Sequence, residues 1–139
     1  MDQELGRILL TYASNKLDQL GGRIVACLNK LNVEQIWARG AENENAVGNL
    51  VLHLCGNVRQ WIGSGMACRP DARQRAEEFA ARSPLSAAAL IGRLQDTVSE
   101  AVSTLRAFPE ARLLDRVTIQ GYQVTLLEVV CHVAEHFSY

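Results

Sequence analysis

Three histidines are the residues of this sequence best suited to chemistry. His53 lies in an apolar stretch near the middle of the chain, and His132 and His136 lie near its end. The latter two are spaced as i and i+4, so on a helix they share one flank. His136 also follows Val133 by three residues, which turns it toward a core. If the two segments pack side by side, the three imidazoles can converge.

Three converging imidazoles predict a site for a divalent metal. Imidazole nitrogen binds zinc, nickel, copper and iron, and three protein ligands with an open position are typical of catalytic zinc. A bound metal lowers the pKa of a coordinated water or thiol and so creates a nucleophile at neutral pH. The alternative is that these histidines only pack or form local hydrogen bonds, and their spacing does not decide between the two.

The other chemically capable residues indicate packing or solvation. The sequence has no GxSxG, P-loop, GxGxxG or HExxH motif. Glu135 lies between the last two histidines but points away from their face, so we expect it to be solvated. The four cysteines are widely spaced and are interpreted as reduced thiols. Cys55 and Cys131, although close to histidines in sequence, are interpreted as packing residues because cysteine is so often buried.

The amino-acid composition limits the classes of protein to which this chain can belong. The chain has 139 residues, of which 48% are apolar and 21% charged, and its net charge is −1. This predicts a single domain over residues 1–139. No basic stripe suggests nucleic acid, and no apolar run approaches the roughly 18 residues that a membrane span needs. The acidic, amphipathic start is unlike a secretory signal, so we expect a cytoplasmic protein.

Apolar residues recur at helical spacing in four segments, which must position the histidines. The segments cover about residues 2–31, 45–62, 85–105 and 126–139. Asp2 can cap the first segment, and a helical turn is expected at 33–37. We therefore predict an all-α protein, an up-and-down four-helix bundle, with His53 on the second helix and the other two histidines on the fourth.

A charged connection joins the second and third predicted helices. Residues 69–82 carry charges of both signs, with Phe79 as the one bulky apolar anchor. We expect a loop with a helical turn that crosses the bundle surface and keeps its charges solvated. Ser83 and Pro84 predict a capped start for the third helix.

The connection before the fourth helix breaks the helical rhythm. Residues 116–124 alternate and carry β-branched residues around Gly121, which predicts a small hairpin or an extended loop. Thr125 and Glu128 then fit a capping box. The fourth helix is shorter than its predicted partners and shows no stop signal at Tyr139, so we expect it to be incomplete at its C-terminal end.

Three stretches of the chain resemble a known family. They are residues 45–59 (NAVGNLVLHLCGNVR), 77–79 (EEF) and 127–139 (LEVVCHVAEHFSY), which look like the DinB superfamily, also called DinB/YfiT-like. The resemblance implies a four-helix bundle with a divalent metal held by one histidine of the second helix and an HxxxH pair of the last. Some members of that family are thiol S-transferases that use low-molecular-weight thiols, others are described only as metal-dependent hydrolases, and many are homodimers.

The resemblance places His53 as the ligand from the second helix. In the family the second histidine of the pair usually precedes Gly-Gln, at what would be position 140. On that register His136 is the first of the pair and His132 is an additional histidine. On the other register the pair is His132 and His136.

We therefore expect zinc or nickel at His53, His132 and His136, with a small-molecule substrate or a low-molecular-weight thiol. The alternative is a non-enzymatic helical binding or interaction module without a functional metal site. We also expect a homodimer, because the family often dimerises and small residues of the third helix permit close approach of helices. These small residues are Ala87, Ala88, Ala89 and Ala101.

Overall fold

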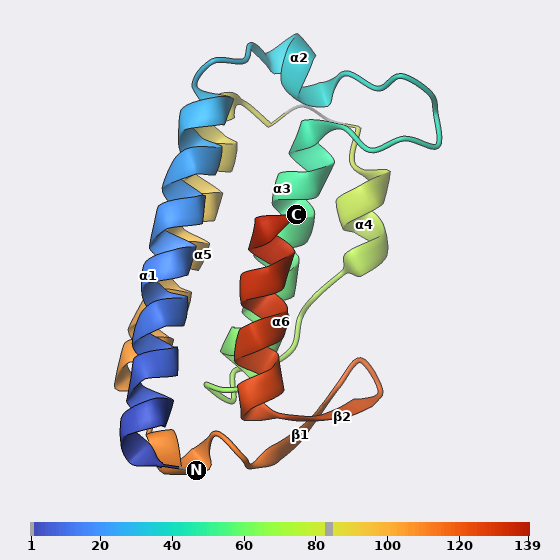
Figure 1. Ribbon diagram of the computed structural model, residues 1–139. Coiled ribbons are helices and arrows are strands. Elements are labelled where there is room, and N and C mark those ends of the chain that lie inside the picture. Colours follow the sequence, from blue (N-terminus) through green and yellow to red (C-terminus); the bar gives the residue numbers. More distant parts are fainter. Residues whose placement is uncertain (1, 83–84) are drawn as a thin grey trace.

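The computed structural model describes residues 2–82 and 85–139 and is mostly helical (Figure 1). The α-helices are α1 (Gln3–Leu28), α2 (Val33–Trp37), α3 (Val47–Val58), α4 (Arg75–Ala80), α5 (Ala87–Ala107) and α6 (Leu126–Ser138). The other elements are a π-helical turn η1 (Arg59–Ser64), a 3-10 turn η2 (Glu110–Arg112), and strands β1 (Arg116–Ile119) and β2 (Tyr122–Thr125). The predicted helical bundle with a short hairpin is confirmed.

Within the described residues, the long helices α1, α3, α5 and α6 lie side by side (Figure 1). α1 packs against α5 and α6, and α3 packs against the same two helices. After η1 the chain returns along the outside of α3 through α4, so α3 and α5 run in the same direction. The bundle therefore departs from the predicted up-and-down order, because the crossover spans the length of α3. The predicted surface crossing with a helical turn is therefore present, and it covers the face of α3 that carries His53. No helix in the described part of the chain is long and apolar enough to cross a membrane.

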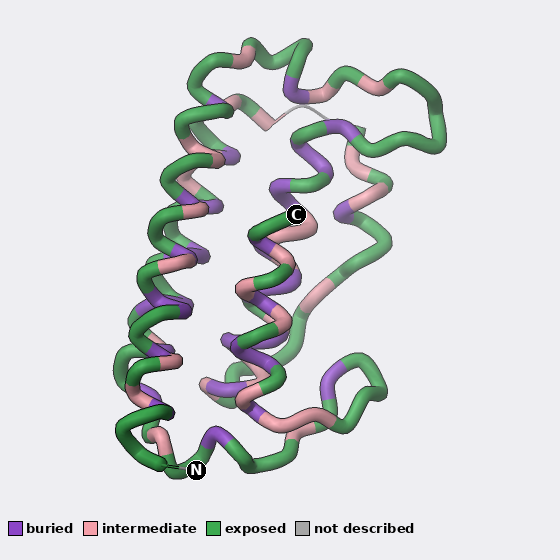
Figure 2. The backbone as a smooth tube through the Cα atoms, viewed as in Figure 1, coloured by how far each residue is buried: buried purple, intermediate pink, exposed green. Residues whose placement is uncertain are grey.

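The apolar stripes meet in one core, and Figure 2 shows the buried positions turned inward on each long helix. The largest fully buried side chains include Leu10 and Leu17 of α1, Val58 of α3, Leu90, Leu94 and Leu105 of α5, and Val129 and Val130 of α6. Burial of each such side chain contributes about 1.5–3 kcal/mol relative to exposure. This packing fixes the rotation of α3 and α6 about their axes, and with it the direction of the histidines at the edge of the core.

The hairpin and the cap before α6 form as predicted. β1 and β2 pair antiparallel, with Ile119 opposite Tyr122. The two turn residues, Gln120 and Gly121, both have positive φ (52° and 80°), as a type I′ hairpin turn requires. The Thr125 hydroxyl accepts a hydrogen bond from the backbone N–H of Glu128, and the Glu128 carboxylate accepts one from the backbone N–H of Thr125. α6 therefore starts at a fixed point.

Of the two other predicted helix caps, one is confirmed and one falls on residues that the structure does not describe. Asp2 caps α1 through the backbone N–H of Glu4. The predicted cap at Ser83 and Pro84 lies outside the described residues, and the structure shows α5 capped by Ser86, whose hydroxyl accepts from the N–H of Ala89.

The four cysteines are free thiols, as expected. Cys55 is buried, and burial raises the pKa of its thiol. Cys131 is exposed, so its interpretation as a packing residue was wrong. It lies on α6 between core positions, on the flank that faces away from the core.

Asn49 fastens the α4 segment to α3. Its side chain is fully buried, and its amide nitrogen donates to the backbone carbonyls of Glu78 (2.8 Å) and Ala81 (3.0 Å). Its amide oxygen accepts from the backbone N–H of Ala46 (3.1 Å) and from Arg39. One side chain therefore satisfies backbone carbonyls at the C-terminal end of α4.

Replacement of Asn49 by alanine is expected to lower the free energy of unfolding by about 1–3 kcal/mol, because buried carbonyls lose their donor. The matched control is Asn43→Ala, at an exposed position of the loop before α3. Urea denaturation measures the free energy of unfolding of both variants. Equal stability of the two variants would show that the Asn49 amide contributes nothing to holding α4.

Candidate functional site

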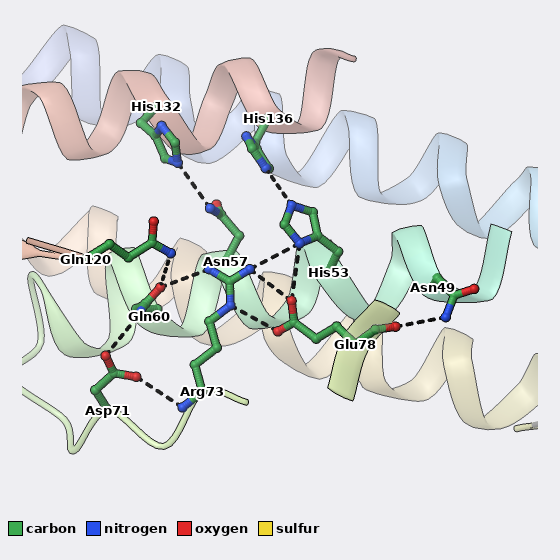
Figure 3. A network of polar contacts seen from close by, with 10 residues as sticks. All are labelled: Asn49, His53, Asn57, Gln60, Asp71, Arg73, Glu78, Gln120, His132 and His136. Carbon is green, nitrogen blue, oxygen red and sulfur yellow. Dashed lines mark hydrogen bonds and ion pairs between the residues drawn. The ribbon is translucent and has the colours of Figure 1, made fainter. Parts of the chain in front are cut away.

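The three histidines lie on facing helices, His53 on α3 and the other two on α6 (Figure 3). The Nε2 atoms of His53 and His136 face each other at 3.0 Å. The ring of His132, one turn earlier on α6, has its centroid 5.0 Å from that of His136. The core packing of α3 against α6 thus brings together all three predicted site residues.

His132 has a different set of contacts from the other two. Its Nε2 is 3.1 Å from the amide nitrogen of Asn57, and its ring stacks on Trp61 with centroids 3.8 Å apart. Asn57 and Trp61 are both buried. Among the described residues, the Asn57 Oδ1 and the Trp61 Nε1 have no hydrogen-bond partner. Such unpaired buried polar atoms are rare in folded proteins and mark this end of the histidine cluster as unusual.

Trp61 reaches His132 from the π-helical turn η1. In this turn the N–H of Gly65 donates to the carbonyl of Gln60, five residues back, in place of the four-residue spacing of an α-helix. Such turns are common at functional sites. The sequence predicts only that the second helix ends nearby, so Trp61 was missed as a site residue.

His53 contacts a charged pair on its other ring nitrogen. Its Nδ1 lies 3.2 Å from the Glu78 Oε1 and 3.1 Å from the Arg73 Nη2. Arg73 and Glu78 bind each other through two hydrogen bonds of 2.9 and 3.0 Å. Phe79 packs against the His53 ring, with centroids 4.8 Å apart.

The prediction that the charges of residues 69–82 are solvated is wrong for this pair. The side chains of Arg73 and Glu78 are only 4% and 10% exposed. Charged side chains are buried in proteins when they are paired, and here each neutralises the other beneath α4. A run of mixed charges without periodicity gives no signal of which members turn inward, although Glu78 belongs to one of the stretches that carry the family resemblance.

The charged pair is tied to the rest of this face through Gln60. The Arg73 Nη1 donates to the Gln60 Oε1 (2.9 Å), which also accepts from Gln120 in the hairpin turn (2.7 Å). The Gln60 amide nitrogen donates to Asp71 (2.8 Å), and this hydrogen bond lowers the pKa of that carboxyl. Hairpin, π-turn and crossover are therefore joined in one polar network that reaches His53 and, through it, His136 (Figure 3).

Burial is the main cause that lowers the pKa of all three histidines. The positive charge of Arg73 lowers the pKa of each ring further. At His53 the hydrogen bond with Glu78 acts in the opposite direction. The rings are therefore neutral at neutral pH, and each keeps one nitrogen lone pair for a hydrogen bond or a metal.

The donor set fits a divalent metal in its chemistry, since neutral imidazoles from two helices are suitable ligands for zinc and nickel. Within residues 2–82 and 85–139, however, no three His, Cys, Asp or Glu side chains are arranged to hold a metal ion. His53 and His136 face each other, whereas the Nε2 of His132 contacts Asn57.

A cavity of about 500 Å³ lies beside this cluster, on the side of α3 that faces α5. It is lined by α3, η1, the crossover and α5, and its walls include Arg59, Arg93 and the Arg73–Glu78 pair. None of the three histidines lines it. The charged pair therefore separates the cavity from His53.

The sequence matches the DinB superfamily over residues 16–137. The chain belongs to the DinB superfamily. The match covers the three histidines and the Arg73–Glu78 pair, and it confirms the resemblance seen in the sequence. No curated protein matches the chain. Both registers that the DinB resemblance allows include His53 and His136, and these are the two histidines whose Nε2 atoms face each other.

Gly56 lies on α3 directly beneath the Glu78 carboxylate, and a Cβ at this position would overlap that carboxylate and approach the Arg73 Nε at 3.0 Å. Gly92 on α5 has no atom within 4 Å of its hypothetical Cβ. Glycine inside a helix costs about 0.5–1 kcal/mol relative to alanine. We expect Gly92→Ala to raise the melting temperature, and Gly56→Ala to lower it because the ion pair must move. If Gly56→Ala is as stabilising as Gly92→Ala, the Glu78 carboxylate is not held in place.

Proposed function

We propose that this DinB superfamily protein binds zinc or nickel through His53, His136 and His132, as a metal-dependent hydrolase or thiol S-transferase that acts on small molecules. One observation carries the proposal: the 3.0 Å approach of two Nε2 atoms from different helices. Zinc–nitrogen bonds of about 2.0–2.1 Å at a tetrahedral angle separate the two nitrogens by about 3.3 Å. The two imidazoles therefore need little movement to share a cation.

The residues around the two facing histidines support this role. A bound metal supplies a coordinated water or thiol of lowered pKa. Glu78 and Phe79 hold the His53 ring from its far side. His132 would give up its contact with Asn57 to become the third ligand, and the stacked Trp61 ring would keep it beside His136.

The rival function is a non-enzymatic helical binding or interaction module. The contact between His132 and Asn57 favours it, because it leaves the three histidines as a hydrogen-bonded cluster within the bundle. Metal content separates the two functions.

The metal is tested on protein purified without a histidine tag and reloaded with zinc or, in a parallel sample, with nickel. We expect the parent chain to bind zinc, and His53→Ala and His136→Ala to lose most of it. Cys131→Ala, an exposed substitution on the same helix as His136, should retain it. Elemental analysis gives the metal content. Zinc at a hundred times its Kd should also stabilise the parent by about 2.7 kcal/mol.

Equal zinc content in His53→Ala and the parent would remove the site as proposed. A parent chain that binds neither zinc nor nickel would favour the helical module.

A homodimer is a separate part of the proposal. Leu5, Ile8 and Tyr12 form an apolar stripe along α1, and each is more than half exposed. The alanines of α5 provide a smaller contact surface for a second copy than the sequence predicts, because Ala101 is buried in the core. An exposed apolar stripe of this kind is a feature of interaction surfaces.

Ile8→Glu is expected to convert a dimer into a monomer, because it places a charge in the centre of the stripe. Leu114→Glu, at another exposed leucine, should leave assembly unchanged. Sedimentation equilibrium at roughly tens of micromolar protein, where a weak interface is populated, distinguishes monomer from dimer. A parent chain found only at its monomer mass of 15.3 kDa would reject the dimer.

A further inference from the structure

We infer that Glu78 is a positioning residue that sets the tautomer of His53: its carboxylate accepts the Nδ1 proton and so leaves the Nε2 lone pair directed at the proposed metal. The inference rests on the proposed function for its consequence, metal affinity. Its structural content, the tautomer, is independent of metal.

The carboxylate is held in one place. Both of its oxygens accept hydrogen bonds from Arg73, at 2.9 and 3.0 Å, and its Oε1 lies 3.2 Å from the His53 Nδ1. Its backbone carbonyl is bound by the buried Asn49 amide, and Gly56 leaves room beneath it. Glu78 is therefore fixed from the main chain to the carboxylate before any ligand arrives.

Two groups compete for the same ring nitrogen. The Arg73 Nη2 is 3.1 Å from the His53 Nδ1, about as close as the Glu78 Oε1. A guanidinium only donates, so a hydrogen bond from Arg73 needs a bare Nδ1 and puts the ring proton on Nε2. A carboxylate only accepts, so a hydrogen bond to Glu78 needs the proton on Nδ1. The two partners demand opposite tautomers.

Glu78 is the partner that determines the position of the ring proton. Both contacts are charge-assisted, because the carboxylate is a charged acceptor and the guanidinium a charged donor, so the deciding difference is whether each partner has other hydrogen bonds. Arg73 does not depend on the ring, because it already donates to both Glu78 oxygens and to Gln60. The His53 Nε2 is then an acceptor, and in the metal-free protein His136 supplies the hydrogen between the two Nε2 atoms.

This arrangement favours metal binding at His53. A carboxylate on the outer nitrogen fixes the ring orientation and raises the basicity of the ligating nitrogen. Without Glu78, Arg73 is the remaining partner of Nδ1, and the proton moves to the nitrogen that should bind the metal. Loss of such a partner typically weakens metal affinity about 10–100-fold.

The test compares Glu78→Gln with Glu77→Gln, which removes the same charge from the exposed neighbouring position. Zinc affinity is measured by competition with a chelator, and the protonated nitrogen of His53 is identified by ¹⁵N NMR of the zinc-free proteins at neutral pH. We expect the parent and Glu77→Gln to show His53 protonated at Nδ1. Glu78→Gln should shift the proton toward Nε2 and bind zinc at least tenfold more weakly.

Two results would overturn the inference: a parent protein with His53 protonated at Nε2, or a Glu78→Gln variant that keeps both the parent tautomer and the parent zinc affinity. The parent tautomer needs no variant, so poor folding of Glu78→Gln leaves this measurement intact. A parent with the Nδ1 proton that binds neither zinc nor nickel would refute the proposed function and leave the assignment of Glu78 standing.

Discussion

The buried ion pair between Arg73 and Glu78 is the interaction on which the histidine site depends. Its two members lie on the crossover and on α4, outside the four long helices of the core. Removal of one partner from a buried pair typically costs about 3–5 kcal/mol, because the other charge is left uncompensated. The pair contacts His53 on α3 and Gln60 on η1, so it fastens the crossover over α3 and at the same time presents a carboxylate to His53. One interaction holds the covering segment and orders the site beneath it.

The fold was predictable from the sequence because its signals are local and periodic. Apolar side chains at helical spacing gave the four long helices, and Thr125 with Glu128 gave the start of α6 almost to the residue. The convergence of the histidines followed from the same reasoning, since a helix that buries Val133 must turn His136 toward its neighbours. Periodicity therefore predicts both the core and the residues at its edge.

The other residues of the site have no periodic signal in the sequence. Arg73 precedes α4 in irregular chain, and its partners are a glutamate five positions later and a glutamine in another element. These contacts arise only when the crossover lies on α3. Trp61 depends on a local departure from α-helical spacing at η1, which the ordinary composition of that segment does not specify. Residues whose roles come from tertiary contact, and not from spacing, are those that sequence analysis missed.

The contacts of the metal-free cluster are compatible with a site that accepts metal. Metal binding would replace the hydrogen bond between His53 and His136 and the contact of His132 with Asn57. A typical hydrogen bond contributes a net stabilisation of about 0.5–1.5 kcal/mol, whereas zinc binding to zinc-finger peptides yields on the order of 10 kcal/mol at neutral pH. If the proposed zinc binds, contacts of this strength would not prevent it, and in its absence they keep the neutral rings oriented. The tenfold or greater effect expected of Glu78 corresponds to about 1.4 kcal/mol or more, which is of the same order as one of these hydrogen bonds. In the proposed site, Glu78 would therefore adjust the metal affinity of histidines that the packing of α3 against α6 brings together.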